Sequence, residues 1–305
     1  PLLTKLYTGM IFGTLPGGAP VELFELSSDK LTVRISNYGG RIISVVKDGM
    51  DMIVGPKHFE DMLKDTCYCG AICGRVANRI AKGRFSIDGD SRTVQEAGRN
   101  TLVLTLHSAD GEENYPGNLE VVATYTVVEE TLHLRLEAYA DAATIVNLTN
   151  HAYWNLSGKP TIDSMTLEVR ASAYTPVDAT NIPDGRILPV EGTDFDLRKA
   201  ALLGERNSSA HPDTAAGLDH NYVLDSEPGD KIAAILLDPE SRHRLIVATD
   251  APGLQVYTGE YLPQARQGIA LEAQGFPNAV NTPHFPSVIL RPGQSAMRSI
   301  TWTVR

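Results

Sequence analysis

Short runs in which apolar and polar residues alternate recur along most of this chain, and they limit its fold more than any other feature. The clearest runs are 119–128 and 131–140, which are separated by two residues. In the second run, Leu132, Leu134 and Leu136 alternate with polar side chains. Alternation with a period of two places the leucines on one face of a strand. The two runs therefore predict an antiparallel hairpin with one buried and one solvated face.

The rest of the chain continues this pattern. Further strands are predicted at 31–36, 41–47, 83–95 (a hairpin with a D-G turn), 143–150, 165–171, 232–237, 243–249, 254–258, 286–291 and 299–304. Helical periodicity is confined to 58–65 and 74–80. Many strands without βαβ alternation predict an all-β fold, a large antiparallel β-sandwich with few short helices. Because no Gly/Ser/Pro-rich linker divides the chain, residues 1–305 are expected to form a single domain.

Charge and cysteine usage exclude several classes of function. The formal net charge is −10 without a basic cluster, so the chain would repel nucleic acid. No apolar run approaches the roughly 18 residues of a membrane span, and no signal-peptide pattern is present. Cys67, Cys69 and Cys73 form one short cluster, which indicates small buried side chains in a reducing compartment rather than a disulfide framework or metal site. We expect a cytoplasmic protein, unless a leader has been removed, with no metal and no cofactor.

The stretch N-L-T-N-H-A-Y-W-N-L (147–156) is unusual for a strand. It carries Asn147, Asn150 and His151 beside the aromatic residues Tyr153 and Trp154. A single histidine in a strand is more often a structural hydrogen-bonding residue. Amides, an imidazole and a phenol together indicate a surface that binds a polyhydroxylated ligand.

Glu272 interrupts an apolar run in G-I-A-L-E-A-Q-G. A buried carboxylate is unfavourable unless it is paired or functional, and burial raises its pKa. Such a group suits a general base or acid. The alternative is a glutamate at a strand edge that faces solvent.

Other polar residues are ambiguous from local sequence. Asp219 lies just before a strand and could either accept hydrogen bonds from sugar hydroxyls or cap a turn. Asn78 and Arg79 supply an amide and a forked cation that fit vicinal hydroxyls. An arginine in a short loop is otherwise usually a surface ion-pair partner.

Seven sequence blocks, taken together and in order, resemble the aldose 1-epimerase (galactose mutarotase) family from about Tyr38 to the C-terminus. The blocks are G-R-V-A-N-R-I-A-K-G, D-G-E-E-N-Y-P-G-N-L, N-L-T-N-H-A-Y-W-N-L-S-G, L-D-H-N-Y-V-L, L-Q-V-Y-T-G, L-E-A-Q-G-F-P-N-A-V-N and F-P-S-V-I-L-R-P-G. The resemblance implies a large antiparallel β-sandwich with the sugar in an open cleft. It also implies a small monosaccharide substrate, and we expect a monomer or a homodimer.

The resemblance implies roles for seven residues. Glu272 would be the general base and His151 the general acid, and Tyr153 would line the cleft near His151. The residues implied to hold the sugar hydroxyls are Asn78, Arg79, Asp219 and Gln255. The base must be ionised while the acid is protonated, and unperturbed pKa values of about 4.3 and 6.5 predict a bell-shaped pH–rate profile.

The chain departs from the family pattern at one motif. The family carries a further substrate histidine in an L-H-G-G motif between the N-R-I and D-G-E-E blocks, and this motif is absent here. His107 lies on the strand leading into D-G-E-E, so by position it is not that histidine. Either the protein lacks this loop, or residues are missing from the sequence near Leu102–Val103, which we favour because the strand is regular on both sides. The connection between Gln255 and Glu272 is also short for the family.

Three further functions compete with that of a mutarotase for galactose or glucose. A hexose-6-phosphate 1-epimerase would need several basic residues at the cleft, where the sequence offers mainly Arg75 and Arg79. A non-catalytic carbohydrate-binding module would need neither Glu272 nor His151. A glycoside hydrolase would need two carboxylates facing one bond, which Asp219 and Glu272 could supply.

Overall fold

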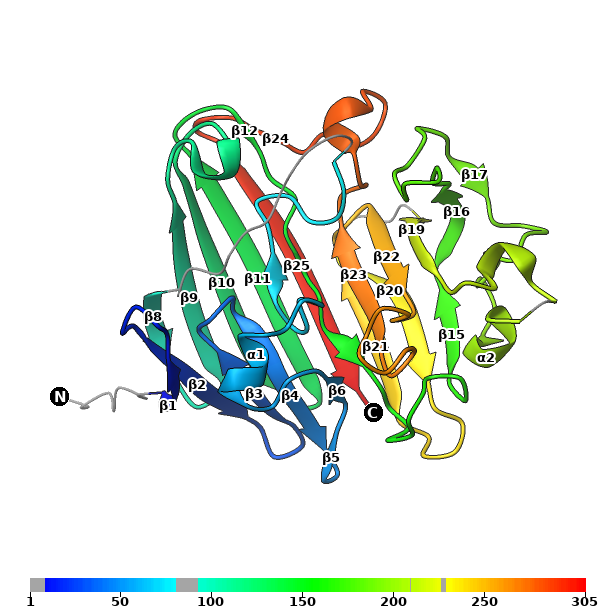
Figure 1. The fold of residues 1–305 in the computed structure, drawn as a ribbon, viewed down its shortest axis with the longest axis horizontal. Coiled ribbons are helices and arrows are strands. Elements are labelled where there is room, and N and C mark those ends of the chain that lie inside the picture. The colour runs from blue at the N-terminus through cyan, green and yellow to red at the C-terminus, as the bar shows by residue number, and fades with distance from the viewer. Residues whose placement is uncertain (1–8, 81–92, 209, 226–228) are drawn as a thin grey trace.

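The computed structural model describes residues 9–80, 93–208, 210–225 and 229–305 (Figure 1). Strands dominate this part of the chain, together with two short α-helices, α1 (Phe59–Met62) and α2 (Leu203–Arg206). Three 3-10 turns accompany them, η1 (Glu112–Asn114), η2 (Pro212–Thr214) and η3 (Ala279–Asn281). None of the helices in the described ranges has the length and apolar character needed to cross a membrane.

The largest sheet has nine strands and forms one layer of the molecule. Its order is β18 (Ala201–Leu202), β15 (Thr166–Val169), β20 (Lys231–Leu237), β21 (Arg244–Thr249), β25 (Ser295–Val304), β11 (Thr131–Ala140), β10 (Leu119–Val128), β9 (Thr101–Ser108) and β8 (Thr93–Ala97). Every neighbouring pair in it is antiparallel.

A seven-stranded sheet carries most of the candidate site. Its order is β17 (Leu188–Pro189), β16 (Ala171–Thr175), β19 (Asp219–Leu224), β22 (Gly253–Tyr257), β23 (Ile269–Gln274), β14 (Tyr153–Trp154) and β6 (Ile53–Val54). A five-stranded meander follows chain order: β1 (Met10–Thr14), β2 (Pro20–Ser27), β3 (Thr32–Ser36), β4 (Arg41–Lys47) and β5 (Met50–Asp51). Two small pairs complete the set: β12 (Thr144–Ile145) with β24 (Ile289–Leu290), and β13 (Thr149–Asn150) with β7 (Ile72–Cys73).

The layers enclose one continuous apolar core. Trp154 of the seven-stranded sheet and Trp302 of the nine-stranded sheet are both buried, and their ring centroids lie 6.1 Å apart. The buried Tyr125 of β10 donates its hydroxyl to the carbonyl of Gly40, next to the five-stranded sheet. The all-β sandwich is therefore confirmed. The continuity of the core from Phe24 to Val304 supports one domain, which stays a prediction.

The central hairpin follows its sequence pattern closely. Strands β10 and β11 pair along their whole length, from Leu119 with Ala140 to Val128 with Thr131. The apolar positions of β11 are buried, whereas His133 on the opposite face is exposed. The alternation predicted for this hairpin is confirmed, because one face covers the core and the other meets solvent.

Several predicted elements differ from the structure. The helix predicted at 74–80 is wrong: Val76 forms a parallel bridge with Asn147, and the amide of Ala77 donates to the Asn147 carbonyl. These backbone groups pair with a distant segment, so they cannot form helical hydrogen bonds. The helix predicted at 58–65 is reduced to α1. The strand at 143–150 is interrupted into β12 and β13, and that at 286–291 shortens to β24. Of the 83–95 hairpin, residues 83–92 lie outside the described part of the chain.

Candidate active site

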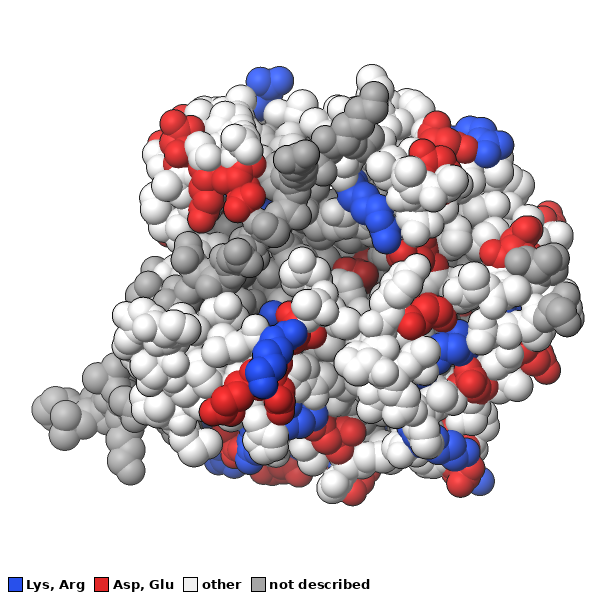
Figure 2. All heavy atoms as spheres, viewed as in Figure 1, with Lys and Arg blue, Asp and Glu red and all other residues white. Residues whose placement is uncertain are grey.

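A cleft of about 620 Å³ is lined by strands of the seven-stranded sheet and by residues from the segments 38–41, 62–79 and 106–121. The predicted site residues that line it are Asn78, Arg79, His151, Tyr153, Asp219 and Glu272. Figure 2 shows acidic atoms on the floor of a hollow in this face, with basic atoms on its upper rim. The hollow is the place where a small polar ligand can reach these side chains.

Glu272 is buried at the centre of the site. It belongs to β23, in which all six residues are buried, and only 5% of its surface is exposed. Burial raises the pKa of its carboxyl above the ordinary range, and attraction to His151 opposes that shift only in part. The interpretation as an edge glutamate in solvent is therefore wrong. A carboxylate with a raised pKa binds a proton more strongly than a free one.

His151 faces Glu272 from the segment between β13 and β14. The backbone fixes it there, because its amide donates to the Ala71 carbonyl and its carbonyl accepts from the Gly70 amide. Its Nε2 lies 3.6 Å from Oε1 of Glu272. The other ring nitrogen, Nδ1, is buried and has no hydrogen-bond partner among the described residues. The imidazole thus reaches the cleft through Nε2.

Tyrosines line the cleft beside the imidazole. The rings of Tyr153 and Tyr257 lie 4.8 Å and 6.5 Å from that of His151. Burial, with Glu272 nearby, raises the pKa of the Tyr153 hydroxyl, so this phenol stays protonated at neutral pH and can donate a hydrogen bond. The hydroxyl of Tyr257 accepts the backbone amide of Tyr261, which lies at the exposed rim. The motif L-Q-V-Y-T-G contains Tyr257, although only Gln255 of this motif was expected at the site.

Asp219 links the remaining predicted residues. One of its carboxylate oxygens accepts from Nη2 of Arg79 at 3.0 Å, and the other accepts from Nε2 of Gln255 at 2.7 Å. Gln255 is only 2% exposed and does not line the cleft; it lies opposite Glu272 in the β22–β23 register. Its contact with the site therefore runs through Asp219. The structure brings all of these residues to one place but puts Gln255 behind the surface.

Asn78 adopts a left-handed backbone conformation, with φ of 64°. Its side-chain oxygen accepts the backbone amide of Arg79, and Asn78 itself lines the cleft. Asparagine tolerates this conformation better than most residues. The turn therefore presents Asn78 and Arg79 side by side at the cleft.

Asn147 and Asn150 were expected to help hold a polyhydroxylated ligand, and this expectation is wrong. Asn147 donates to the carbonyl of Gly275 and accepts its amide, at 3.1 Å and 2.7 Å. Asn150 donates to the Gly70 carbonyl and accepts the Ala152 amide. Both side chains are buried, and their hydrogen bonds hold irregular backbone on either side of the sheet strands rather than a ligand.

No metal site is found around the cysteines or the histidines in the part of the chain that the structure describes. Cys69 is buried, Cys67 and Cys73 are half-buried, and none of the three forms a disulfide. Among the residues that the structure describes, no group of three or more histidine, cysteine, aspartate or glutamate side chains could hold a metal ion. His107 is exposed on β9 and is absent from the cleft lining. Within the described ranges, His151 is the histidine that lines the cleft.

Comparisons with known proteins find relatives over nearly the whole chain. The family model described as aldose 1-epimerase matches residues 22–101 and 91–301. Galactose mutarotase from Rattus norvegicus is 40% identical, with 97% of this chain and 97% of the rat protein covered. Aldose 1-epimerase from Escherichia coli K12 is 29% identical, with 92% of this chain and 94% of that protein covered. The solved structure of galactose 1-epimerase from Lactobacillus acidophilus is 28% identical, with 97% of each chain covered and a TM-score of 0.85.

The comparisons also bear on the missing motif. The alignment with the rat protein spans 336 positions, more than the 305 residues of this chain, so this chain has gaps relative to that protein. The two parts of the family match overlap at residues 91–101, just before the suspected break at Leu102–Val103. Strand β9 nevertheless runs without interruption through both residues.

The fold, the cleft and these matches lead to one conclusion: the chain belongs to the aldose 1-epimerase family.

Proposed function

We propose that this protein is an aldose 1-epimerase that interconverts the α and β anomers of an aldohexose such as galactose or glucose. One observation carries the proposal: Nε2 of His151 and Oε1 of Glu272 lie 3.6 Å apart in the cleft. In a pyranose, the anomeric hydroxyl and the ring oxygen are bonded to the same carbon, C1. A reaction that moves protons on both oxygens therefore needs a base and an acid that are close together.

The two side chains divide the proton transfers between them. Glu272 takes the proton of the C1 hydroxyl while the bond between C1 and the ring oxygen breaks. His151 donates a proton to the ring oxygen, which would otherwise leave as an alkoxide. After rotation about the C1–C2 bond, the ring closes on the other face of the aldehyde with the two roles reversed. The raised pKa of the Glu272 carboxyl favours its action as a base.

The sugar hydroxyls would be held by the polar groups beside this pair. Arg79 offers guanidinium donors, Asn78 offers an amide, and Asp219 offers carboxylate oxygens. Gln255 would act by fixing the Asp219 carboxylate through its hydrogen bond. Tyr153 would place its protonated phenol and apolar ring near His151.

A hexose 6-phosphate is a less favourable substrate. Among the residues that the structure describes, three arginines line the cleft, and each is bonded to protein groups. Arg41 pairs with Asp65, Arg79 pairs with Asp219, and Arg75 donates to Ser108 and to carbonyl groups. A phosphate would need a guanidinium or ammonium group without such partners.

A carbohydrate-binding module and a glycoside hydrolase receive less support from the same geometry. A binding module without turnover has no use for a buried carboxylate 3.6 Å from an imidazole. A glycoside hydrolase would need Asp219 as a free second carboxylate, but both of its oxygens accept hydrogen bonds from Arg79 and Gln255. A monomeric or homodimeric state and a cytoplasmic location stay predictions, the second supported by the absence of a disulfide among Cys67, Cys69 and Cys73.

Optical rotation tests the proposal directly. The wild-type protein should speed the decay of the rotation of freshly dissolved α-D-galactose toward its equilibrium value, well above the rate in buffer. The Glu272→Gln variant keeps the shape of the side chain and removes the base, so its rate should fall close to that of buffer. A wild-type rate equal to that of buffer with both galactose and glucose would contradict the proposal.

A further inference from the structure

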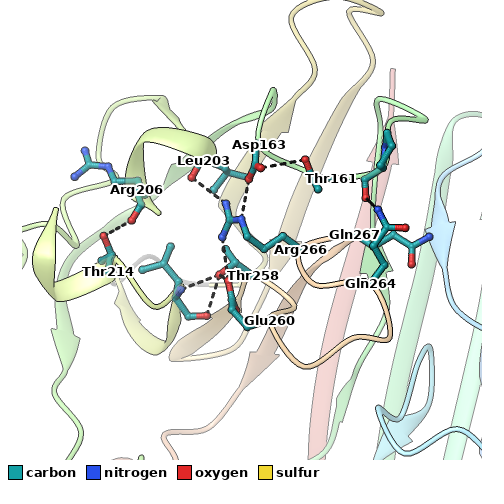
Figure 3. Close-up of polar contacts among 12 residues, drawn as sticks. Thr161, Asp163, Leu203, Arg206, Thr214, Thr258, Glu260, Gln264, Arg266 and Gln267 are labelled. Atoms are coloured by element: carbon teal, nitrogen blue, oxygen red, sulfur yellow. Dashed lines mark hydrogen bonds and ion pairs between the residues drawn. The ribbon is translucent and has the colours of Figure 1, made fainter. Parts of the chain in front are cut away.

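A buried arginine outside the cleft organises the connection between β22 and β23. Arg266 is only 6% exposed, and its guanidinium is held on three sides (Figure 3). Nε donates to Asp163 at 2.7 Å, Nη1 donates to Glu260 at 3.0 Å, and Nη2 donates to the Leu203 carbonyl at 3.0 Å. The side chain thus joins three segments that are far apart in sequence.

The backbone of Arg266 is held as firmly as its side chain. Its amide donates to the Gly259 carbonyl, and its carbonyl accepts the Ile162 amide. Its φ is 60°, a left-handed conformation that is unfavourable for a non-glycine residue. A residue keeps such a conformation only where its surroundings fix it. Here the backbone bonds to Gly259 and Ile162 and the contacts of the guanidinium fix it together.

A chain of hydrogen bonds leads from Arg266 toward the cleft. The oxygen of Glu260 that accepts from Arg266 also accepts the hydroxyl of Thr258, at 2.6 Å. The same hydroxyl accepts the backbone amide of Leu218 at 2.8 Å, and the amide of Thr258 donates to the Leu218 carbonyl. Leu218 directly precedes Asp219, the carboxylate that contacts Arg79 and Gln255.

The turn before Leu218 leaves room for the carboxylate of Glu260. Gly217 has a φ of 91°, and a Cβ atom at this position would collide with the Glu260 carboxylate. The close approach therefore requires a glycine here. Glu260 is thus fixed from two directions, by the backbone of the Asp219 turn and by the guanidinium of Arg266.

We propose that Arg266 and Thr258, acting through Glu260, are positioning residues that hold Asp219 in the orientation that binds the sugar. This role rests on the proposed function. It also explains how the short connection between Gln255 and Glu272 keeps a fixed shape: Arg266 ties that connection to Asp163 and Leu203, outside the seven-stranded sheet. The network touches no reacting atom, so it affects sugar binding and leaves the proton transfers to Glu272 and His151.

Thr258 offers the sharpest test, because valine has the same branched shape without the hydroxyl. We expect Thr258→Val to raise KM for galactose about tenfold while kcat stays within about twofold, since a small displacement of a binding group weakens binding strongly. Thr258→Ser keeps the hydroxyl and should restore the wild-type KM. Arg266→Met should raise KM in the same way. The KM of the double variant should be no higher than the higher of the two single-variant values, because both residues act through Glu260.

Arg298 provides a matched control. It belongs to β25, pairs with Asp250 and lies outside the cleft lining. Arg298→Met should lower Tm and leave KM unchanged. A folded Thr258→Val variant with the wild-type KM would overturn the inference, as would equal losses in the Val and Ser variants. If the wild type turns over sugar and Glu272→Gln does not, the proposed function holds. The KM values of the Thr258 and Arg266 variants then test the positioning role alone. A wild type without mutarotase activity would overturn both the proposed function and this inference.

Discussion

Nε2 of His151 lies 3.6 Å from Oε1 of Glu272, although the two residues belong to different motifs. The imidazole comes from the segment between β13 and β14, and the carboxylate comes from the centre of β23. Pairing of β14 with β23 brings the two segments together, with Tyr153 opposite Ala270. The proposed base therefore lies within the sheet, and the proposed acid lies two residues before β14, a strand of the same sheet. Groups placed by sheet strands are held more rigidly than groups on a long loop.

Removing either member of this pair should nearly abolish turnover. We expect Glu272→Gln and His151→Asn each to lower kcat by about 10²- to 10⁴-fold, because each removes one proton-transfer group. Polarimetry with galactose measures the effect, and near-ultraviolet circular dichroism checks that each variant is folded. A variant that is folded and retains more than about a tenth of the wild-type kcat would contradict its assigned role.

The pH dependence of kcat/KM should report the burial of Glu272. Burial raises the pKa of this carboxyl, and the base must be ionised, so activity should be lost on acidification at a pH above the ordinary value of about 4.3. Initial polarimetric rates across acidic and neutral pH, corrected for the buffer-catalysed reaction, would locate this limb. An acid limb at or below the ordinary glutamate value would show that the carboxyl is not perturbed as the structure indicates.

The ionised carboxylate of Glu272 should make the protein less stable at neutral pH than a neutral side chain at the same position would. Because its pKa is raised in the folded state, the stabilisation that it contributes is fully present below the unfolded pKa of about 4.3 and is lost as the pH rises through the folded value. Glu272→Gln removes the buried charge, so its Tm should exceed that of the wild type at neutral pH. The difference should disappear on acidification, and a lower Tm for the variant at neutral pH would refute this prediction.

Asp219→Asn should weaken sugar binding more than turnover. The amide group that replaces one carboxylate oxygen cannot accept a hydrogen bond from Arg79 or Gln255, so the arrangement at the cleft is disturbed. We expect KM to rise roughly ten- to hundredfold, which corresponds to the loss of a charge-assisted hydrogen bond. Asp184→Asn breaks a comparable ion pair with Arg186 outside the cleft lining and serves as the control. Equal KM changes in the two variants would argue against the binding role of Asp219.

Asn147→Ala should reduce stability. It would leave the buried amide and carbonyl of Gly275 without their partner, at a cost of about 1–3 kcal/mol for each group. Chemical denaturation should therefore show a free energy of unfolding lower by about 2–6 kcal/mol. A loss below about 0.5 kcal/mol would mean that this amide does not hold the backbone.

Part of this structure could be predicted residue by residue. The alternation of Leu132, Leu134 and Leu136 predicts strand β11 of the β10–β11 hairpin, because a period of two places these leucines on one face of a strand. The continuous apolar run around Glu272 favours its burial for a different reason, because a strand that is buried on both faces is apolar along its length. The segment 74–80 could not be predicted, because its backbone pairs with Asn147, which lies far away in sequence. No local pattern reports such a partner.

The sequence by itself determined the strand-rich class of this protein, the family motifs and the identity of the acid and base candidates. These features depend on local periodicity and on residue chemistry, which are present in any stretch of chain. Only the tertiary structure decided that Gln255 lies behind Asp219, that Asn147 and Asn150 hold backbone, and that Arg266 ties the β22–β23 connection to two distant segments. Each of these depends on which distant groups meet when the sheets pack, and a hydrogen bond between such groups leaves no trace in either local sequence.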